Sequence, residues 1–432
     1  MQLSRYLKIY PCPDRPGRNI LYSTKRSAIV QLSDAALQAA RDGSLASPER
    51  DTLSRLGFLV ADPAAERAEM RDLFANDNRT RNLFSAVAVL NLDCNLACTY
   101  CYEDRFRGSH YMSQEIANLL VATTRQRIEQ GRNIKLSFYG GEPLLSRDLI
   151  RDISIPLQQA AQEQGVAYSF SLVTNGTLLS RSVVEELLPL GLSGAKVTLD
   201  GPAELHNQSR PFASGRGSFD AIVKNVIAIH DILPLQLGGN FTRDNYRRFP
   251  ELLDLLLDQG LAPHKLHSFL CAPVIPKSGE RVLKDFNTDC ACSYEPWLNE
   301  AALFLREEGL KRGFPAPKMK VSGCMVEFDD DLVINYDGSL YKCPAFMAYD
   351  QLRIGTLADG IGDYRVSHNM DVWKKDECLD CAYLPLCFGG CRQMTLLRNG
   401  AIDDVDCRKD LFDATLEGII RQDMQYQATK KK

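Results

Sequence analysis

The sequence predicts an α/β fold in which parallel strands alternate with helices, followed by a cysteine-rich C-terminal region. Two observations predict it. Between residues 83 and 270, six strand-like segments alternate with five helical segments. This alternation is typical of βαβ units in a barrel or an open sheet. After residue 290 the alternation weakens, and seven of the 14 cysteines lie in the last quarter of the chain.

The boundaries of the elements follow from the periodicity of apolar residues. Strands are expected at 85–92, 134–139, 167–173, 195–199, 235–241 and 265–270, and helices at 114–130, 147–164, 181–190, 219–227 and 249–257. Residues 1–60 predict three short strands (6–10, 19–23 and 28–32) and two helices, which begin near Ala35 and at Ser47. Residues 61–82 are rich in charged residues and alanine and predict a helical linker.

Composition excludes several classes of protein. The 51 basic and 55 acidic residues give a formal net charge of -4, which argues against a protein that binds nucleic acid or an anionic membrane. No apolar stretch approaches the ~18 residues of a membrane span, and residues 1–10 lack the apolar core of a signal peptide. We therefore expect a cytoplasmic protein. Because disulfides are rare there, 14 cysteines indicate metal binding or redox chemistry.

The cysteines form two groups. Cys94, Cys98 and Cys101 make a C-x3-C-x2-C run, and the second group comprises Cys324, Cys343, Cys378, Cys381, Cys387, Cys391 and Cys407. Clustered thiolates at such spacing select zinc or iron–sulfur clusters. One zinc ribbon would use four ligands, usually in two C-x2-C pairs. Seven thiols exceed one zinc site and nearly fill two four-ligand clusters, so the pattern favours two iron–sulfur clusters.

Four loops that follow the first four strands carry polar or glycine-rich motifs. The first cysteine run follows the first strand, Gly-Gly-Glu-Pro (140–143) the second, Thr-Asn-Gly (174–176) the third and Asp-Gly-Pro (200–202) the fourth. Loops at the carboxyl ends of parallel strands meet on one rim, where such folds place their chemistry. We therefore expect these four loops to form one site.

These motifs resemble those of radical S-adenosylmethionine (SAM) enzymes, which have such a cysteine loop, with an aromatic residue before the third cysteine, and a Gly-Gly-Glu-Pro loop. The C-terminal cysteines resemble the SPASM extension, in which C-x(9–15)-G-x4-C precedes C-x2-C-x5-C-x3-C and a last cysteine; Gly338 supplies the glycine. The resemblance covers about residues 83–407. It implies a partial (β/α)6 TIM-like barrel of the radical SAM type at 83–289, a SPASM domain at 290–415 and a tail at 416–432.

The resemblance implies cofactors and ligands. In the family, three thiolates hold a [4Fe-4S] cluster that binds SAM, and SAM cleavage gives a 5'-deoxyadenosyl radical that abstracts a hydrogen atom from the substrate. The implied ligands here are Cys94, Cys98 and Cys101. The residues implied to contact SAM are Tyr100, Gly140, Gly141, Glu142, Pro143, Thr174, Asn175 and Asp200. Taken alone, Thr174, Asn175 and Asp200 would fit a turn or helix cap equally well. No catalytic side chain is identified.

Two auxiliary [4Fe-4S] clusters are implied by the same resemblance. Cys324, Cys343 and Cys391 would hold the first, and Cys378, Cys381, Cys387 and Cys407 the second. Three clusters could use eleven cysteines, one more than the motifs supply. The eleventh ligand is either Cys290 or Cys292, or it is absent and leaves an iron open to a substrate thiolate. Cys12 and Cys271 are expected to be ordinary thiols.

SPASM enzymes mostly modify peptides and proteins, and residues 1–60 resemble the winged-helix-type domain that binds a leader peptide by strand addition. A structural cap on the barrel is the alternative. The favoured function is maturation of a ribosomally made precursor peptide by thioether formation, as in geopeptide-type maturases. The expected partners are the precursor peptide and an electron donor of the flavodoxin or ferredoxin type, with no nucleic acid and no membrane.

Two other functions compete with this one. Anaerobic sulfatase maturases, which form formylglycine, share the cluster layout but normally have a catalytic aspartate after the second cysteine of the extension. Here Pro344 follows Cys343. The other competitor is a non-enzymatic electron carrier or zinc-binding module, which would need no Gly-Gly-Glu-Pro loop.

Overall fold

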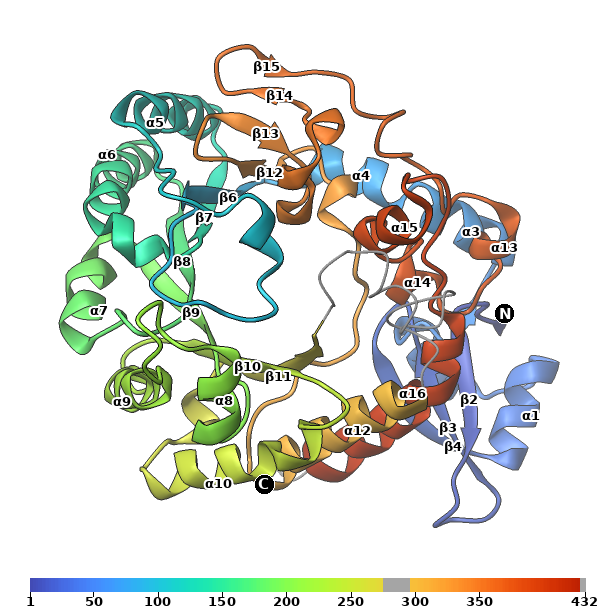
Figure 1. Ribbon diagram of the computed structural model, residues 1–432. Coiled ribbons are helices and arrows are strands. Elements are labelled where there is room, and N and C mark those ends of the chain that lie inside the picture. The colour runs from blue at the N-terminus through green and yellow to red at the C-terminus, as the bar shows by residue number, and fades with distance from the viewer. Residues whose placement is uncertain (275–295, 428–432) are drawn as a thin grey trace. The chain divides into compact units, whose positions relative to one another are not determined.

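The structure is a computed structural model that describes residues 1–274 and 296–427. The chain forms two compact units, and each is assembled from separate stretches of sequence (Figure 1). Unit 1 comprises Met1–Thr80, Lys318–Phe328 and Asn369–Lys432, and unit 2 comprises Arg81–Pro317 and Asp329–His368. The N-terminal 80 residues therefore belong to the same unit as most of the C-terminal cysteines.

Unit 2 contains the predicted α/β fold. Its six parallel strands lie side by side in chain order: β6 (Leu83–Asn91), β7 (Asn133–Gly140), β8 (Tyr168–Thr174), β9 (Leu192–Thr198), β10 (Leu235–Phe241) and β11 (Ser268–Pro273). The connecting helices cover the outer face of the strands: α5 (Gln114–Glu129), α6 (Arg147–Gln164), α7 (Arg181–Leu187), α9 (Phe219–Ile229) and α10 (Phe249–Asp258) (Figure 1). The six-stranded α/β fold expected from the sequence is confirmed.

The sheet extends beyond these six strands. Strand β12 (Asp331–Ile334) pairs in parallel with β6, and β13 (Ser339–Tyr341), β14 (Gly355–Thr356) and β15 (Gly360–Ile361) continue the sheet in antiparallel order. The sequence did not predict these short strands, nor α8 (Ala203–Ser209) and α12 (Pro296–Lys311). The predicted strand at 265–270 begins later, because a short 3-10 turn (Pro263–Lys265) precedes β11.

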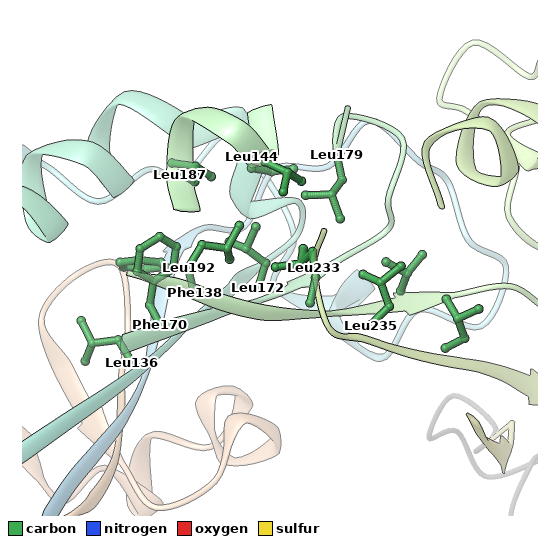
Figure 2. Close-up of a cluster of buried hydrophobic side chains, with 14 of the residues drawn as sticks. Leu136, Phe138, Leu144, Phe170, Leu172, Leu179, Leu187, Leu192, Leu233 and Leu235 are labelled. Carbon is green, nitrogen blue, oxygen red and sulfur yellow. The ribbon is translucent and has the colours of Figure 1, made fainter. Parts of the chain in front are cut away.

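The core of unit 2 lies between the strands and the outer helices. Figure 2 shows how Leu136, Phe138, Phe170 and Leu172 from neighbouring strands meet Leu187, which comes from α7. Side chains alternate along these strands, so every second residue faces the helices. Ser137 of β7 and Ser171 of β8 occupy intervening positions, and their hydroxyl groups lie 3.4 Å apart. Burial of the apolar outer face therefore fixes the register of the strands.

Unit 1 begins with a small antiparallel sheet, in the order β2 (Leu7–Pro11), β3 (Arg18–Ser23) and β4 (Ala28–Ser33), followed by α1 (Asp34–Asp42) and α2 (Ser47–Arg55). Ser33 caps α1, because its hydroxyl group accepts a hydrogen bond from the Ala36 amide at 3.1 Å. A two-residue pairing joins β1 (Gln2–Leu3) to β5 (Leu59–Val60). The segment expected to be a helical linker forms α3 (Pro63–Arg71) and α4 (Leu73–Thr80).

The rest of unit 1 is mainly helical: α13 (Asp376–Leu379), α14 (Leu384–Cys387), α15 (Arg392–Asn399) and α16 (Lys409–Gln422). Helix α16 crosses the boundary expected between 415 and 416, because Leu416 and Ile420 are buried in the core of the unit. Among the described residues, no helix is long and apolar enough to cross a membrane.

Substituting a fully buried strand residue should destabilise unit 2 strongly. We expect Leu172→Ala to lower the free energy of unfolding by about 2–5 kcal/mol, because it leaves a cavity between the sheet and the outer helices. Denaturant unfolding followed by circular dichroism measures this. Val366→Ala is the control in the same unit, because Val366 is 92% exposed and its truncation should change stability by less than about 0.5 kcal/mol. Equal effects of the two substitutions would contradict the assigned core.

Candidate functional site

The first cysteine run lies in the loop that follows β6. Cys94, Cys98 and Cys101 are free thiols and partly buried, and burial raises the pKa of each. Two backbone hydrogen bonds hold the loop, from Ala97 to the Pro211 carbonyl at 2.8 Å and from Thr99 to the Ser209 carbonyl at 2.9 Å. The loop is therefore anchored to the segment that follows α8, which comes after the fourth strand.

The three thiols fit an iron–sulfur cluster. They share one loop, and Cys98 interacts electrostatically with both other thiols. In the described part of the chain, no three Cys, His, Asp or Glu side chains converge closely enough to hold a single metal ion. A [4Fe-4S] cluster is larger than a single ion, so its cysteine ligands stand further apart. Soft thiolates in one loop are the donor set that such a cluster takes.

Gly140 and Gly141 allow the second loop to lie against the first. A Cβ atom on Gly140 would lie 2.1 Å from the Asn91 carbonyl oxygen, and one on Gly141 would lie 2.1 Å from that of Asp93. Only glycine fits at such a close approach of two backbones. The Asn91 side chain adds hydrogen bonds to the Glu142 carbonyl at 3.1 Å and to the Ser146 hydroxyl at 2.8 Å.

Glu142 joins the second and third loops. Its carboxylate is completely buried, and it accepts hydrogen bonds from the amides of Leu144 at 3.0 Å and Asn175 at 2.8 Å and from the Thr174 hydroxyl at 2.8 and 2.9 Å. Burial raises the pKa of Glu142, and these donors oppose that shift. Both carboxylate oxygens are engaged within the protein. Glu142 therefore holds the two loops together, and the contact with SAM that the resemblance implies stays a prediction.

The Thr174–Asn175–Gly176 loop reaches the cysteine loop. The Asn175 side-chain amide donates to the Asn95 side chain at 2.8 Å and lies 3.7 Å from the Cys94 sulfur. Asn95 in turn donates to the Thr177 hydroxyl at 2.9 Å. The loops after the first three strands therefore meet as the sequence predicted.

Asp200 completes this rim within a buried network. The Tyr100 hydroxyl donates to the Asp200 carboxylate, and the Asn240 amide donates to it at 2.7 Å. The Arg210 guanidinium donates to the Tyr100 oxygen at 3.0 Å and interacts electrostatically with Cys98. Arg210 and Asn240 were not predicted, because a single arginine in a loop and a single asparagine in a strand give no local signal in the sequence. Arg210 supplies a buried positive charge beside the cysteine loop.

The His206 side chain holds the backbone of Asp200 in place. Its ring is fully buried; Nδ1 accepts from the Asp200 amide at 3.1 Å, and Nε2 pairs with the Ser218 hydroxyl at 3.0 Å. Acceptance at Nδ1 requires a neutral ring with its proton on Nε2. Burial, assisted by the charge of Arg210, lowers the pKa of His206 to about 3.

The C-terminal cysteines are divided between the two units. Cys324, Cys378, Cys381, Cys387, Cys391 and Cys407 belong to unit 1, whereas Cys343 belongs to unit 2, where it follows β13. Cys378 interacts electrostatically with Cys381, Cys387 and Cys407, and Cys324 interacts with Cys391. All of these thiols are free. The four thiols that the resemblance assigns to the second auxiliary cluster thus lie together in unit 1. Cys290 and Cys292 lie outside the described residues.

Two further groups of side chains near the cysteines were not predicted. In unit 1 a buried ion pair of 2.6 Å joins Arg392 to Glu327, and the Trp373 ring nitrogen donates to the same Glu327 oxygen at 3.0 Å. In unit 2 the hydroxyl groups of Tyr102 and Tyr139 are in contact, and the buried Glu103 interacts with both. Tyr102 also interacts electrostatically with Cys343.

Comparisons with known proteins agree with this geometry. The model of the radical SAM superfamily matches residues 90–256, which contain the first cysteine run and the three loops that meet it. Residues 90–256 therefore form a radical SAM domain. A cysteine-type anaerobic sulfatase-maturating enzyme of Clostridium perfringens is 27% identical over 69% of this chain and 86% of its own length. An Fe-coproporphyrin III synthase of Methanosarcina barkeri is 30% identical over 40% of this chain and 41% of its own.

Solved structures share the fold of this chain. Native anSMEcpe with bound AdoMet has a TM-score of 0.60 at 20% identity and covers 78% of this chain and 98% of its own. Streptococcus suis SuiB bound to S-adenosylmethionine has a TM-score of 0.55 at 16% identity and covers 95% of this chain and 99% of its own. The cofactors of the radical SAM domain are a [4Fe-4S] cluster and SAM. A non-enzymatic electron carrier or zinc-binding module is therefore set aside.

Introducing a single methyl group between the first two loops should disrupt the site. We expect Gly141→Ala to weaken SAM binding at least tenfold and to reduce the iron content, because its Cβ would displace Asp93, the residue before Cys94. Equilibrium binding of SAM and iron analysis measure this. Gly362→Ala is the control, because its nearest contact is 3.4 Å away and it should bind SAM like the unaltered protein. Normal SAM binding by Gly141→Ala would refute the close approach.

His206 should make the protein sensitive to acid. Its folded pKa of about 3 lies below the ordinary value of 6.5, so below pH 6.5 the unfolded chain binds a proton that the folded chain does not. Stability is therefore lost as the pH falls, by about 2 kcal/mol between pH 7.5 and pH 5 from this residue. His206→Asn can still accept from the Asp200 amide but does not titrate. Denaturant unfolding measures the free energy of unfolding of the unaltered protein and of His206→Asn. The difference between the two should change by about 2 kcal/mol between pH 7.5 and pH 5. A difference that does not change with pH would contradict the neutral ring.

Proposed function

We propose that this protein is a maturase that modifies a ribosomally made precursor peptide, joining a cysteine thiol to a carbon atom of another residue by a thioether bond. The observation that carries the proposal is the edge of β4 in the N-terminal sheet. Strand β4 pairs only with β3 in the described part of the chain, so its outer edge is open. An open edge offers backbone donors and acceptors that an extended peptide can pair with.

The architecture of the sheet favours β4 over the other edge. Strand β2 ends at Pro11, which has no N–H to donate, and the Arg421 side chain already donates to the Pro11 carbonyl at 2.8 Å. Both faces of the sheet are covered within unit 1, one by α1 and α2 and the other by the C-terminal helices. Edge pairing at β4 is therefore the mode of docking that the sheet leaves available to a leader peptide.

The residues of the rim prepare the site for the radical reaction. When bound, the cluster and SAM supply a 5'-deoxyadenosyl radical, which removes a hydrogen atom from the substrate. Cys94, Cys98 and Cys101 would hold the cluster. Glu142 fixes the two loops that approach the cysteine loop, and Arg210 places a positive charge where the SAM carboxylate can be neutralised.

Pro344 favours thioether formation over formylglycine formation. It follows Cys343 directly and begins a 3-10 turn (Pro344–Ala348), so no carboxylate occupies the position of the aspartate base in sulfatase maturases. Thioether formation would need no such base if the substrate thiol gave up its proton to an auxiliary cluster, which the C-terminal cysteines would hold. The peptide would lose two hydrogen atoms in total: one as an atom, taken by the radical, and one as a proton and an electron, which that cluster would accept.

Sulfatase maturation is the second candidate. Curated relatives that match 69–78% of this chain are cysteine-type anaerobic sulfatase-maturating enzymes from two Clostridium species. The buried Glu103, which lies within unit 2 against two tyrosines, is a carboxylate that could replace the missing aspartate. The two candidates differ in product, because one joins two residues and the other converts a cysteine side chain into an aldehyde.

Product analysis separates the two functions. The reduced, cluster-loaded protein is incubated with SAM and with either a cysteine-containing precursor peptide encoded beside its gene or a sulfatase-derived cysteine peptide. We expect 5'-deoxyadenosine and a precursor lighter by two hydrogen atoms, with its leader required. A mass change only in the sulfatase peptide, matching exchange of the thiol for an aldehyde, would favour the second candidate. Absence of 5'-deoxyadenosine with any peptide would contradict both.

A further inference from the structure

We propose that the N-terminal segment of unit 1 also forms part of the second auxiliary cluster site: the hydroxyl groups of Tyr6, just before β2, and Thr24, just after β3, position the turn that carries Cys378 and Cys381. The inference rests on the proposed function and on the ligand set that the resemblance implies for that cluster, which is Cys378, Cys381, Cys387 and Cys407. It gives the N-terminal residues a role that is independent of leader-peptide binding.

Two hydrogen bonds join the sheet to the cysteine turn. The Tyr6 hydroxyl donates to the Leu379 carbonyl at 2.9 Å, and the Thr24 hydroxyl donates to the Ala382 carbonyl at 2.7 Å. These carbonyls belong to the residue after Cys378 and the residue after Cys381. Tyr6 and Thr24 are both completely buried. Each cysteine of the C-x2-C pair is therefore followed by a peptide group that is fixed by a hydroxyl group from the N-terminal segment.

The two hydroxyl groups are themselves held in place. The Thr24 amide donates to the Tyr6 carbonyl at 3.0 Å, which links the two residues. Glu66 of α3 is buried and accepts from the Ser4 hydroxyl at 2.7 Å and from the Arg5 amide at 3.1 Å. The residues immediately before Tyr6 are thus tied to a helix, so the Tyr6 ring meets the turn in one orientation.

Apolar packing continues the same contact. Tyr6 shares a buried cluster with Leu379 and Leu384, and Cys12, Ile20 and Tyr22 share another with Tyr383, Leu386 and Phe412. Ion pairs from Arg67 to Asp376 and Asp380 lie at the surface and add little stability. The sheet therefore covers the cysteine turn with buried side chains and bonds it with buried hydroxyl groups.

Such contacts influence a cluster in two ways. Groups that orient the ligands raise the affinity for the metal, and their loss typically lowers it by 10–100-fold. The reduction potential of an iron–sulfur cluster depends on the polar groups and the exposure around it. Releasing the two carbonyls should change the orientation of both peptide groups. We therefore expect weaker retention of the cluster and a changed potential.

The test uses the full chain with Cys94, Cys98 and Cys101 replaced by alanine, so that only auxiliary clusters contribute. In this background, Tyr6→Phe and Thr24→Val remove the two hydroxyl groups and keep the shapes of the side chains. We expect the double variant to lose the second cluster to a chelator about tenfold faster, with a shifted midpoint potential and electron paramagnetic resonance signal. Thr24→Ser, which keeps its hydroxyl group, should resemble the unaltered background.

Tyr22→Phe is the matched control. Its hydroxyl donates to the Met319 carbonyl at 2.9 Å, which is the same kind of bond in the same unit but outside the cysteine turn. It should leave the signal and the potential of the second cluster unchanged. The inference would be overturned if the double variant kept the chelation rate, midpoint potential and signal of the unaltered background. It would also be overturned if Tyr22→Phe changed them to the same extent. Signals of both auxiliary clusters that survive Cys378→Ala and Cys381→Ala would instead overturn the ligand set that the resemblance implies for the second cluster, and this inference with it.

Discussion

The site of this enzyme depends on one buried carboxylate. Glu142 has no access to solvent, and donors from the second and third loops satisfy its two oxygens. A buried charge is costly unless several hydrogen bonds compensate it, so the two loops are held in the arrangement that provides those bonds. The glycines before Glu142 then bring this pair of loops against the backbone that leads into Cys94. The location of the cysteine loop thus depends on the hydrogen bonds of the Glu142 carboxylate and on the lack of side chains at Gly140 and Gly141.

Much of unit 2 could be predicted, because its strands and helices are long enough for periodicity to be clear. The first three loops that the sequence brought together do meet, since parallel strands end on one side. The rest required tertiary information. Strands β12 to β15 are two to four residues long, too short for an alternating pattern. Arg210 contacts Tyr100, which is distant in the sequence. His206 contacts the nearby Asp200, but no local sequence pattern indicates that contact.

The role of Glu142 shows another limit of reasoning from motifs. A motif identifies which residues a site contains but not which bonds each of them makes within the protein. Within Gly-Gly-Glu-Pro, the glycines contribute by having no side chain and the glutamate by accepting bonds from the protein. Asp200 is similar, because Tyr100 and Asn240 engage its carboxylate. The carboxylates of Glu142 and Asp200 therefore both help to build the rim.

The double coverage of the N-terminal sheet bears on how such an enzyme could be given a new substrate. A recognition domain joined by a flexible linker could be exchanged for another as an independent module. Here Tyr22 and Ile20 are part of the same core as Leu386 and Phe412, hundreds of residues later in the chain. A chimaera cut after residue 60 or 80 would expose apolar surface on both fragments. Under the proposed edge pairing, retargeting is better attempted by altering the side chains along β4 than by transplanting the domain.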